Sequence, residues 1–421
     1  MIAFVRRLIL RPSAAYLLTS ALTKVGSLLL VPFYTRAMTV EAYGDYALAL
    51  TVLSLGPAFV LGLPTALTKS YFDVKDPQEA RLRFGGVAKL LVAAACVVAV
   101  LGEIAILILA KDSGSFLGQR GLTCVNVATW GTTLLAIPIQ FSRDTQRPLV
   151  ATVFQIAEFA LSFGLGITLA YVLRRGLIGA LETLALTYGL LGLLSIAYVF
   201  RVLGGLPTPP LMKFAFSFSL PYVPHFLAVW VQGVAERWVM KAVGREAELG
   251  SYAIASQLAA PVNLFVMSWN LERSARTGEL YREEGREGLK RELPGITRGY
   301  LLISMLPSLL VSISLPIVPL ILGEKYGNVI YYAPFLLIAI IIEACYCPPN
   351  QVAYYTGHSG RIATATVASA GAAIATSVVL VPLLGVWGAV LTRIVSATVR
   401  TGAMWYAARQ CLQPTPSTET V

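Results

Sequence analysis

Residues 87–110 read VAKLLVAAACVVAVLGEIAILILA, with Lys89 and Glu103 as the only charged side chains in the run. A helix rises 1.5 Å per residue, so roughly 20 mostly apolar residues cross the hydrocarbon core of a bilayer. Comparable runs recur along nearly all of the 421-residue chain, which is 56% hydrophobic and 13% charged, with a mean hydropathy of +0.70. Because no soluble core of this size could bury so much apolar surface, the sequence predicts an all-α integral membrane protein.

Apolar runs, read against breaks that contain charge, Pro or Gly, predict about 12 transmembrane helices. We expect two six-helix bundles, over residues 1–205 and 206–411, followed by a disordered cytoplasmic tail over 412–421. The expected spans are residues 14–34, 46–68, 87–110, 122–141, 150–173, 176–200, 214–240, 251–271, 297–322, 329–355, 362–384 and 385–408.

Basic residues indicate the orientation of these spans. If the N-terminus is cytoplasmic, most Lys and Arg fall on the cytoplasmic side, as short loops require. Both termini are therefore predicted to be cytoplasmic. The net charge of +11 is scattered between apolar segments and forms no single patch, so we expect no nucleic-acid partner.

The five cysteines lie in or beside apolar stretches without a framework spacing, which is typical of small hydrophobic side chains. Cys345 and Cys347 with His358 offer only a weak hint of a metal site. We expect neither a metal nor a cofactor.

The longest polar segment runs from Glu272 to Arg298 and mixes both charge signs with Leu280, Tyr281, Leu289 and Leu293. This pattern is typical of an interfacial helix, but a solvated connector explains it equally well.

An internal repeat appears at equivalent places in the two predicted halves. Residues 36–49 read RAMTVEAYGDYALA, and residues 241–255 read KAVGREAELGSYAIA, with one residue inserted. A basic residue, Glu-Ala, Gly and Tyr-Ala recur in order, which indicates duplication. Because each half has an even number of spans, the halves should share one orientation, be related by an axis along the membrane normal, and enclose a binding cleft.

Equivalent spans in the two halves carry polar residues at helical spacing. Each such Ser or Thr could also simply join helices by hydrogen bonds. The polar faces comprise Tyr16, Ser20, Lys24, Ser27 and Tyr34 on the first span, His225, Gln232 and Glu236 on the seventh, Thr51, Ser54, Thr65 and Lys69 on the second, and Ser256, Asn263, Asn270 and Arg273 on the eighth.

Charges inside the spans are the strongest functional candidates, since a charge at mid-bilayer costs about 3 kcal/mol or more and normally faces a bundle interior or wet cavity. A basic cleft suits an anionic group such as phosphate, although soluble carboxylates would also fit. The predicted substrate-binding residues are Lys24, Lys69, Arg237, Arg273, Arg276, Asn263 and Asn270.

Glu236 and His225 are predicted coupling or charge-partner residues on the seventh span. Arg237 could simply pair with Glu236. For a further set of intramembrane charges, the sequence does not decide between structural ion pairs and cavity groups: Glu103, Glu158, Glu182, Glu343, Arg393 and Arg400.

The stretch from Leu18 to Tyr71 resembles a known family. It contains LTSALTK (residues 18–24), PFYTR (residues 32–36), EAYGDY (residues 41–46) and GLPTAL (residues 62–67). These residues resemble the O-antigen-type polysaccharide-biosynthesis flippases of the multidrug, oligosaccharidyl-lipid and polysaccharide exporter (MOP) superfamily. The resemblance implies a bacterial inner-membrane protein that flips an undecaprenyl-diphosphate-linked oligosaccharide from the cytoplasmic to the periplasmic leaflet for surface polysaccharide assembly.

The resemblance also implies alternating access driven by an H⁺ or Na⁺ gradient, contact with membrane lipids, and a polysaccharide polymerase and chain-length regulator as possible partners. Lys24 matches a basic cavity position of that family, whereas Arg237 and Arg273 extend the idea to the second half.

Two other functions remain open. A drug or small-molecule exporter of the same superfamily would normally favour an acidic cavity, which Lys24 opposes. A membrane-embedded glycan polymerase or glycosyltransferase would need a sizeable outer loop or a convergent set of carboxylates and His, and the predicted outer loops are short. We therefore expect a transporter and not an enzyme.

Overall fold

A computed structural model describes residues 12–110 and 116–413, apart from the side chains of residues 12–21, 24, 271 and 275. Every predicted span coincides with one helix or with a run of consecutive helices, and the described residues contain no β-strand. Nine described helical segments are long and apolar enough to cross a membrane, or ten when a bent pair is counted as one span. The all-α polytopic fold class is thereby confirmed.

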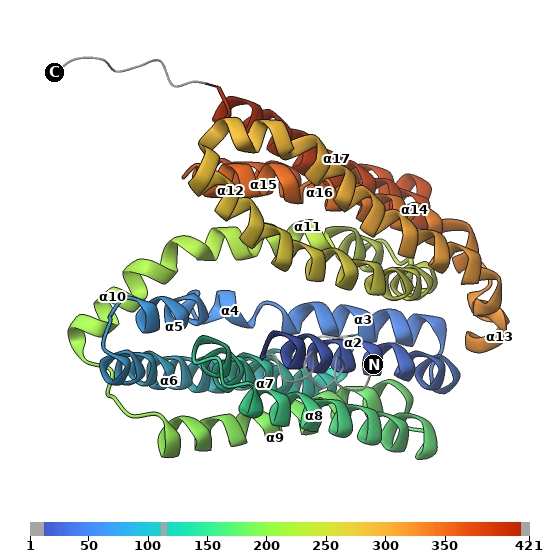
Figure 1. Cartoon of the computed structure of the whole chain (residues 1–421). Helices are drawn as coiled ribbons and strands as arrows, with labels where there is room; N and C mark the ends of the chain where they lie inside the picture. The colour runs from blue at the N-terminus through green and yellow to red at the C-terminus, as the bar shows by residue number, and fades with distance from the viewer. Residues whose placement is uncertain (1–11, 111–115, 414–421) are drawn as a thin grey trace, which may run out of the picture. The chain divides into compact units, whose positions relative to one another are not determined.

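The chain divides into two compact units, residues 1–230 and 231–421. The first unit contains six expected spans and the helix that follows them (Figure 1). Its elements are α2 (Pro12–Ala37), α3 (Val40–Leu53), α4 (Gly56–Phe59), α5 (Leu63–Phe72), α6 (Pro77–Leu109), α7 (Gly118–Asp144), α8 (Pro148–Leu165), the π-helix η1 (Gly166–Val172), α9 (Gly176–Val202), α10 (Pro209–Ser219), η2 (Leu220–Tyr222) and the start of α11 (Val223–Ala242).

Helix α10 explains why this unit extends past residue 205. The predicted boundary falls within residues 203–208, which are not helical, but α10 follows them and packs against α5 and α6. Leu211 lies on Gly86 of α6, and Ser219 lies on Gly62. The two compact units of the structure meet within α11, between residues 230 and 231. The boundary at residue 205 stays a prediction of where the two duplicated halves of the sequence meet.

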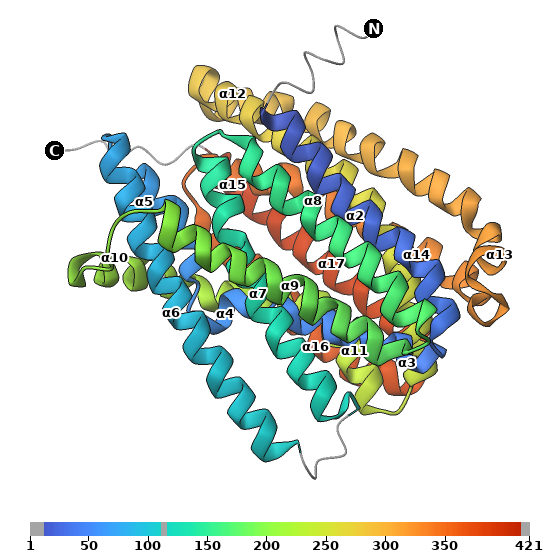
Figure 2. The same cartoon turned by 90° about the horizontal axis from the view of Figure 1, so that it is seen from below.

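Small residues set the closest helix packing in the first unit. Helices α7 and α9 run side by side (Figure 2), and a Cβ built on Gly192 of α9 would lie 2.9 Å from the Cα of Gly131 on α7. Glycines allow backbones to approach this closely, and in lipid such packing replaces the hydrophobic effect as a source of helix association.

The second predicted span is broken. The pair Val40–Phe59 and Leu63–Phe72 bends by 51°, at a left-handed Gly62 (φ +71°) with Pro64 in the first turn of α5. The hydroxyls of Thr51, Ser54 and Thr65 donate to carbonyls three residues earlier in the chain. The bend separates Thr51 and Ser54 from Thr65 and Lys69, which were expected to share one face of a single helix.

Helix α8 continues directly into the π-helix η1. Gly166 begins η1, and a Cβ there would lie 2.7 Å from the hydroxyl of Tyr34 on α2. The π-helical turn thus begins at the point where α8 and α2 are so close that residue 166 has no room for a side chain.

The second unit contains the remaining helices of the described chain. They are the end of α11, α12 (Glu246–Ser314), η3 (Leu315–Ile317), α13 (Val318–Leu322), η4 (Glu324–Tyr326), α14 (Val329–Ala344), α15 (Cys347–Tyr355), α16 (Ser359–Leu384) and α17 (Val386–Cys411). Helix α12 joins two expected spans and is interrupted at Gly285, whose φ of 64° and ψ of −146° are not helical.

The polar segment Glu272–Arg298 is helical on both sides of this interruption. Its Leu289 and Leu293 are buried, and Leu280 and Tyr281 pack against the same cluster, which includes Val352 of α15 and Met404 of α17. These apolar side chains are therefore covered by protein. The predicted tail begins at Leu412, which belongs to the same cluster, and its residues from 414 onward lie outside the described chain.

Both copies of the repeat motif sit at the same kind of place. The first spans the turn between α2 and α3, and the second spans the turn between α11 and α12. Their tyrosines, Tyr46 and Tyr252, are both buried.

Candidate functional site

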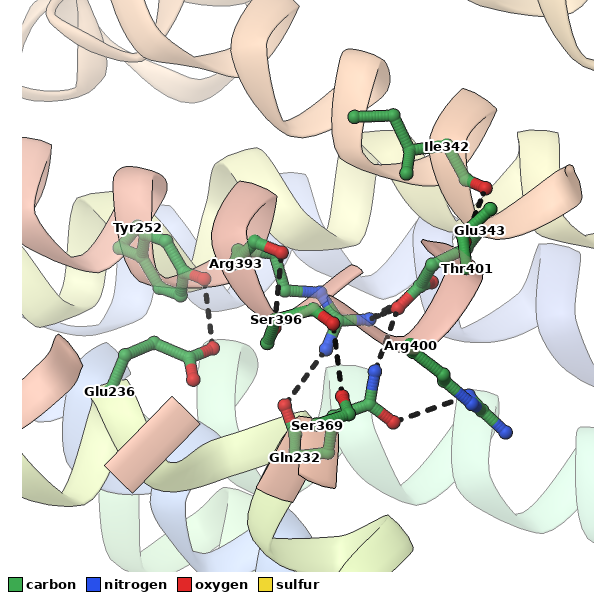
Figure 3. A network of polar contacts seen from close by, with 10 residues as sticks. All are labelled: Gln232, Glu236, Tyr252, Ile342, Glu343, Ser369, Arg393, Ser396, Arg400 and Thr401. Carbon is green, nitrogen blue, oxygen red and sulfur yellow. Dashed lines mark hydrogen bonds and ion pairs between the residues drawn. The ribbon is translucent and has the colours of Figure 1, made fainter. Parts of the chain in front are cut away.

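Helix α11 places two polar side chains, Gln232 and Glu236, one turn apart on a buried face of the second unit (Figure 3). Glu236 is 1% exposed and Gln232 is 3% exposed. The i, i+4 spacing puts both on one side of the helix. Their partners come from α12, α14 and α17.

Arg393 of α17 is the centre of the network. Its Nη2 lies 2.9 Å from Oε1 of Glu343 and donates to Oε2 at 3.2 Å, while its Nη1 donates to the backbone carbonyl of Gln232 at 3.1 Å. Both charged side chains are 23% exposed. A charge that is removed from water needs such a partner, because desolvation alone costs several kcal/mol per ion.

A second arginine of α17, Arg400, adds another cation to the site. Its Nη1 donates to Oε1 of Gln232 at 3.2 Å, and its guanidinium lies 4.1 Å from the ring centroid of Tyr346. Nε2 of Gln232 in turn donates to Oε1 of Glu343 at 3.4 Å. Gln232 thus bridges the two arginines and Glu343.

Further hydrogen bonds fix α17 in place. The hydroxyl of Thr401 donates to the carbonyl of Ile342 on α14 at 3.0 Å, and Ser369 of α16 donates to the carbonyl of Ser396 at 3.0 Å. Helix α17 is therefore bonded to α14 and α16 close to its two arginines.

Glu236 has a different environment. The Tyr252 hydroxyl donates to its Oε1 at 2.8 Å, whereas its Oε2 is buried and has no hydrogen-bond partner among the described residues. The neighbouring Arg237 guanidinium carbon lies 5.8 Å from the Tyr252 ring centroid, and its buried Nε likewise lacks a partner in the described chain. No ion pair joins Glu236 to Arg237 among the described residues.

These unsatisfied atoms border a cavity of about 170 Å³. Polar and charged groups dominate the residues that line it: Glu236, Arg237, Tyr252, Ser256, Asn263, Glu343 and Arg393, together with Gly233, Ala259, Ala260, Leu336 and Ile340. A small polar space with an incompletely bonded carboxylate can hold water and exchange a proton or a small ion. Arg237 and Arg393 face Glu236 and Glu343 in this cavity. Arg400 of the adjoining network adds a third cation, so ionised side chains would leave the site as a whole with a positive excess.

The structure brings three of the predicted site residues together in this cavity: Arg237, Glu236 and Asn263. Asn270 lies in a separate hydrogen-bonded cluster, where its Oδ1 accepts from the Tyr300 hydroxyl at 2.8 Å and from Gln351 at 3.1 Å. Arg273 is half-buried one turn further along and forms no ion pair among the described residues. Arg276 is exposed and pairs with Glu272 at 2.6 Å.

Three predicted residues belong to the first unit. Lys69 is exposed and pairs with Asp73 at 3.1 Å. His225 begins α11 beside the Phe226 ring, with ring centroids 6.3 Å apart. Lys24 falls within α2, but its side chain lies outside the described residues.

The intramembrane glutamates left open by the sequence also have partners. Glu182 binds Arg120 and Arg175. Glu103 accepts from Thr123 and Asn126, and Glu158 accepts from Tyr188. Arg393 is paired with Glu343, and Arg400 with Gln232.

Tyr252 is the site residue that sequence reasoning did not single out. It appeared only as part of the repeat motif, and no local pattern shows that its hydroxyl reaches Glu236. Tyr252 follows Glu236 by sixteen residues, across the turn after α11, and this short separation is the one feature of the sequence that could have indicated the contact. The described residues contain no group of three His, Cys, Asp or Glu side chains able to hold a metal ion.

By sequence, the chain matches no family profile and no curated relative. By fold, it resembles solved membrane transporters over nearly its whole length. An inward-facing multidrug resistance MATE family transporter of the MOP superfamily has a TM-score of 0.74 at 14% identity, covering 92% of this chain and 94% of that one.

An outward-facing structure of such a transporter has a TM-score of 0.65 at 13% identity, covering 96% and 95% of the two chains. A mutant of the Vibrio cholerae MATE transporter VcmN has a TM-score of 0.63 at 13% identity, with 97% of each chain covered. The chain therefore has the fold of MATE transporters, and at these identities the likeness establishes the fold alone.

Proposed function

We propose that this protein is a membrane transporter that works by alternating access. The observation that carries this proposal is the whole-length likeness of fold to transporters solved in inward-facing and outward-facing conformations. A fold alone does not define a function. The buried charges at Glu236, Glu343 and Arg393 support transport independently, since intramembrane ionisable groups normally mark an ion or substrate pathway.

We propose that the passenger is an anionic amphiphile, specifically an undecaprenyl-diphosphate-linked oligosaccharide that moves from the cytoplasmic to the periplasmic leaflet of a bacterial inner membrane. The excess of arginine over glutamate at the site supports an anion. Arg237 and Arg273, which have no carboxylate partner among the described residues, are the proposed diphosphate ligands with Lys24. Lys69 and Arg276 are weaker candidates because Asp73 and Glu272 already pair with them.

Export of drugs or other small molecules is the second candidate. The solved proteins of similar fold favour it more directly, because two of them are described as multidrug resistance transporters. The free carboxylate oxygen of Glu236 could attract a cationic drug. The positive excess of the site favours the first candidate and the named neighbours favour the second, and a transport assay with two probes separates them.

The deciding experiment uses the full chain reconstituted in liposomes. A polyprenyl-diphosphate disaccharide that carries a fluorophore reports flipping through its accessibility to an external quencher, and a cationic dye reports drug export. We expect protein-dependent flipping of the first probe and none for a zwitterionic phospholipid carrying the same fluorophore. Transport of the dye without flipping would favour the drug exporter, and movement of neither probe would contradict both.

Substitutions then test the assigned ligands. Lys24→Ala should abolish flipping while the protein stays in the membrane, and Arg237→Gln and Arg273→Gln should reduce it severalfold or more. The matched control is Arg143→Gln, because that guanidinium is exposed on the first unit and is not a proposed ligand. Equal activity of all four variants would refute the ligand assignment.

Glu236 is the proposed coupling residue for an H⁺ or Na⁺ gradient. Glu236→Gln keeps an acceptor for the Tyr252 hydroxyl but cannot ionise. We expect the variant to equilibrate the passenger but to lose acceleration by an imposed ion gradient. Unchanged gradient dependence would exclude this role.

A further inference from the structure

A larger cavity, of about 610 Å³, lies elsewhere in the second unit and shares no lining residue with the charge cluster. Its walls come from the part of α12 that follows Gly285 and from the end of α17. Its volume is within the range of small-molecule binding sites. The lining residues are Lys290, Leu293, Pro294, Thr297, Arg298, Leu301, Trp405, Arg409, Leu412 and Gln413.

Apolar side chains form the floor of this cavity. Leu293 and Leu412 belong to a buried cluster. The indole N–H of Trp405 donates to the carbonyl of Cys345 at 3.1 Å, and the hydroxyl of Thr297 donates to the carbonyl of Leu293 at 2.8 Å. Because these polar groups are already bonded within the protein, the floor offers an occupant mainly apolar surface.

The rim of the cavity is cationic. Lys290, Arg298 and Arg409 are exposed, and the ten lining residues include no acidic side chain. Within the described parts of the chain, none of these three cations forms an ion pair or a hydrogen bond with a carboxylate. The adjacent Arg291, by contrast, pairs with Glu284 at 2.5 Å.

The position of the cavity along the helices matches a membrane interface. The helical segment Arg276–Leu322 has 47 residues, whereas roughly 20 are enough to cross the hydrocarbon core. Its first part, with Lys290 and Arg298, is the polar segment predicted to be cytoplasmic, and Trp405 is a residue type enriched at membrane interfaces.

We propose that this cavity binds an anionic phospholipid of the cytoplasmic leaflet. The phosphate lies among Lys290, Arg298 and Arg409, and an acyl chain lies along Leu293, Leu301 and the Trp405 ring. Basic pockets between transmembrane helices on the cytoplasmic side select lipids of this charge. The proposal requires only that the protein sits in a membrane, and it holds whichever passenger is transported.

Lipid retention measured by native mass spectrometry tests the charge requirement. The purified full chain is titrated with phosphatidylglycerol and, separately, with phosphatidylcholine of the same acyl chains. We expect one phosphatidylglycerol to bind preferentially and the triple variant K290Q/R298Q/R409Q to bind it on the order of tenfold to a hundredfold more weakly. The charge-retaining variant K290R/R298K/R409K should bind it nearly as well as the unaltered protein.

A matched triple variant controls for a general loss of positive charge. Arg143, Arg201 and Lys213 are exposed basic residues of the first unit, also on segments predicted to be cytoplasmic. R143Q/R201Q/K213Q should retain the bound lipid. If it loses the lipid as completely as K290Q/R298Q/R409Q does, binding is diffuse and the proposed site is wrong.

Trp405 reports the position of the acyl chain. Phosphatidylglycerol with brominated acyl chains, at a low mole fraction, should quench a component of tryptophan fluorescence that is missing from Trp405→Phe and from K290Q/R298Q/R409Q. Equal quenching by brominated phosphatidylcholine would overturn the proposal. So would displacement of phosphatidylglycerol by an equal concentration of polyprenyl diphosphate, since the cavity would then belong to a transported lipid. Neither outcome depends on a transport assay.

Discussion

Arg393 of α17 and Glu343 of α14 form a two-oxygen contact, at 2.9 and 3.2 Å, and the same guanidinium holds the backbone carbonyl of Gln232 on α11 at 3.1 Å. One side chain therefore joins three helices of the second unit. Among the described residues, the carboxylate of Glu343 forms an ion pair with no other cation.

Removing either member of this pair should destabilise the protein. Arg393→Gln or Glu343→Gln leaves the partner charge only 23% exposed, and loss of one partner of a buried pair costs about 3 kcal/mol or more; partial exposure lowers that figure. The double variant should lose less than the sum of the single variants. Thermal unfolding of all four proteins in one detergent measures the coupling, and strict additivity would show that the pair does not interact.

Loss of the Tyr252 hydroxyl should also lower stability. Tyr252→Phe removes the hydrogen bond that Glu236 accepts at 2.8 Å, leaving a buried carboxylate without that donor, at a cost of roughly 1 to 3 kcal/mol. Tyr331 of α14, which is 63% exposed, provides the control, and Tyr331→Phe should unfold like the unaltered protein. Equal melting temperatures for the two variants would contradict the assigned role.

The packing of α7 against α9 should not tolerate a methyl group at Gly131. A Cβ at this position would overlap the backbone carbonyl of Tyr188, which cannot rotate away, so Gly131→Ala should cost roughly 1 to 3 kcal/mol. Gly371 of α16 has nothing within 4 Å of its Cβ position, and Gly371→Ala should be neutral or stabilising. Thermal unfolding of the two variants in the same detergent measures the difference. If Gly131→Ala were as stable as the unaltered protein, α7 and α9 would have to lie further apart than the structure shows.

The interruption of α12 should depend on Gly285. Its φ of 64° with ψ of −146° is nearly restricted to glycine, so Gly285→Ala should cost about 1 to 3 kcal/mol or force the helix to straighten. Gly295 lies in the same helix with open space around its Cβ position, and Gly295→Ala should be neutral or stabilising. Distances between spin labels on either side of residue 285 would detect straightening. If Gly285→Ala and Gly295→Ala showed the same distances and the same stability, glycine would not be required at position 285.

Much of the fold could be predicted because membrane insertion imposes a long apolar run on every span. Residues 87–110 needed no tertiary information to be recognised, and they lie within α6. The bend at Gly62 was less accessible. Pro64 lies within an apolar run, where a proline is often tolerated, and only the contact between Gly62 and Ser219 of α10 shows why the chain turns there.

The candidate site was predicted only in part, for a physical reason. Spacing on one helix identified Glu236 and Arg237, because helical periodicity is local. The pairing of Arg393 with Glu343 joins positions 50 residues apart and depends on how α14 and α17 pack. The sequence offered several glutamates of similar character as partners for Arg393, and only the packing distinguishes Glu343 from the others.

The π-helix η1 has a consequence for any counting of positions along α8. Each residue of a helix advances the side-chain direction by about 100°, and a wide turn accommodates an extra residue without lengthening the hydrogen-bonded column in proportion. Side chains from Gly166 to Val172 are therefore out of angular phase with those of the preceding α8. Deleting a single residue within η1 would therefore convert the wide turn into a regular one and leave the start of α9 near its present position.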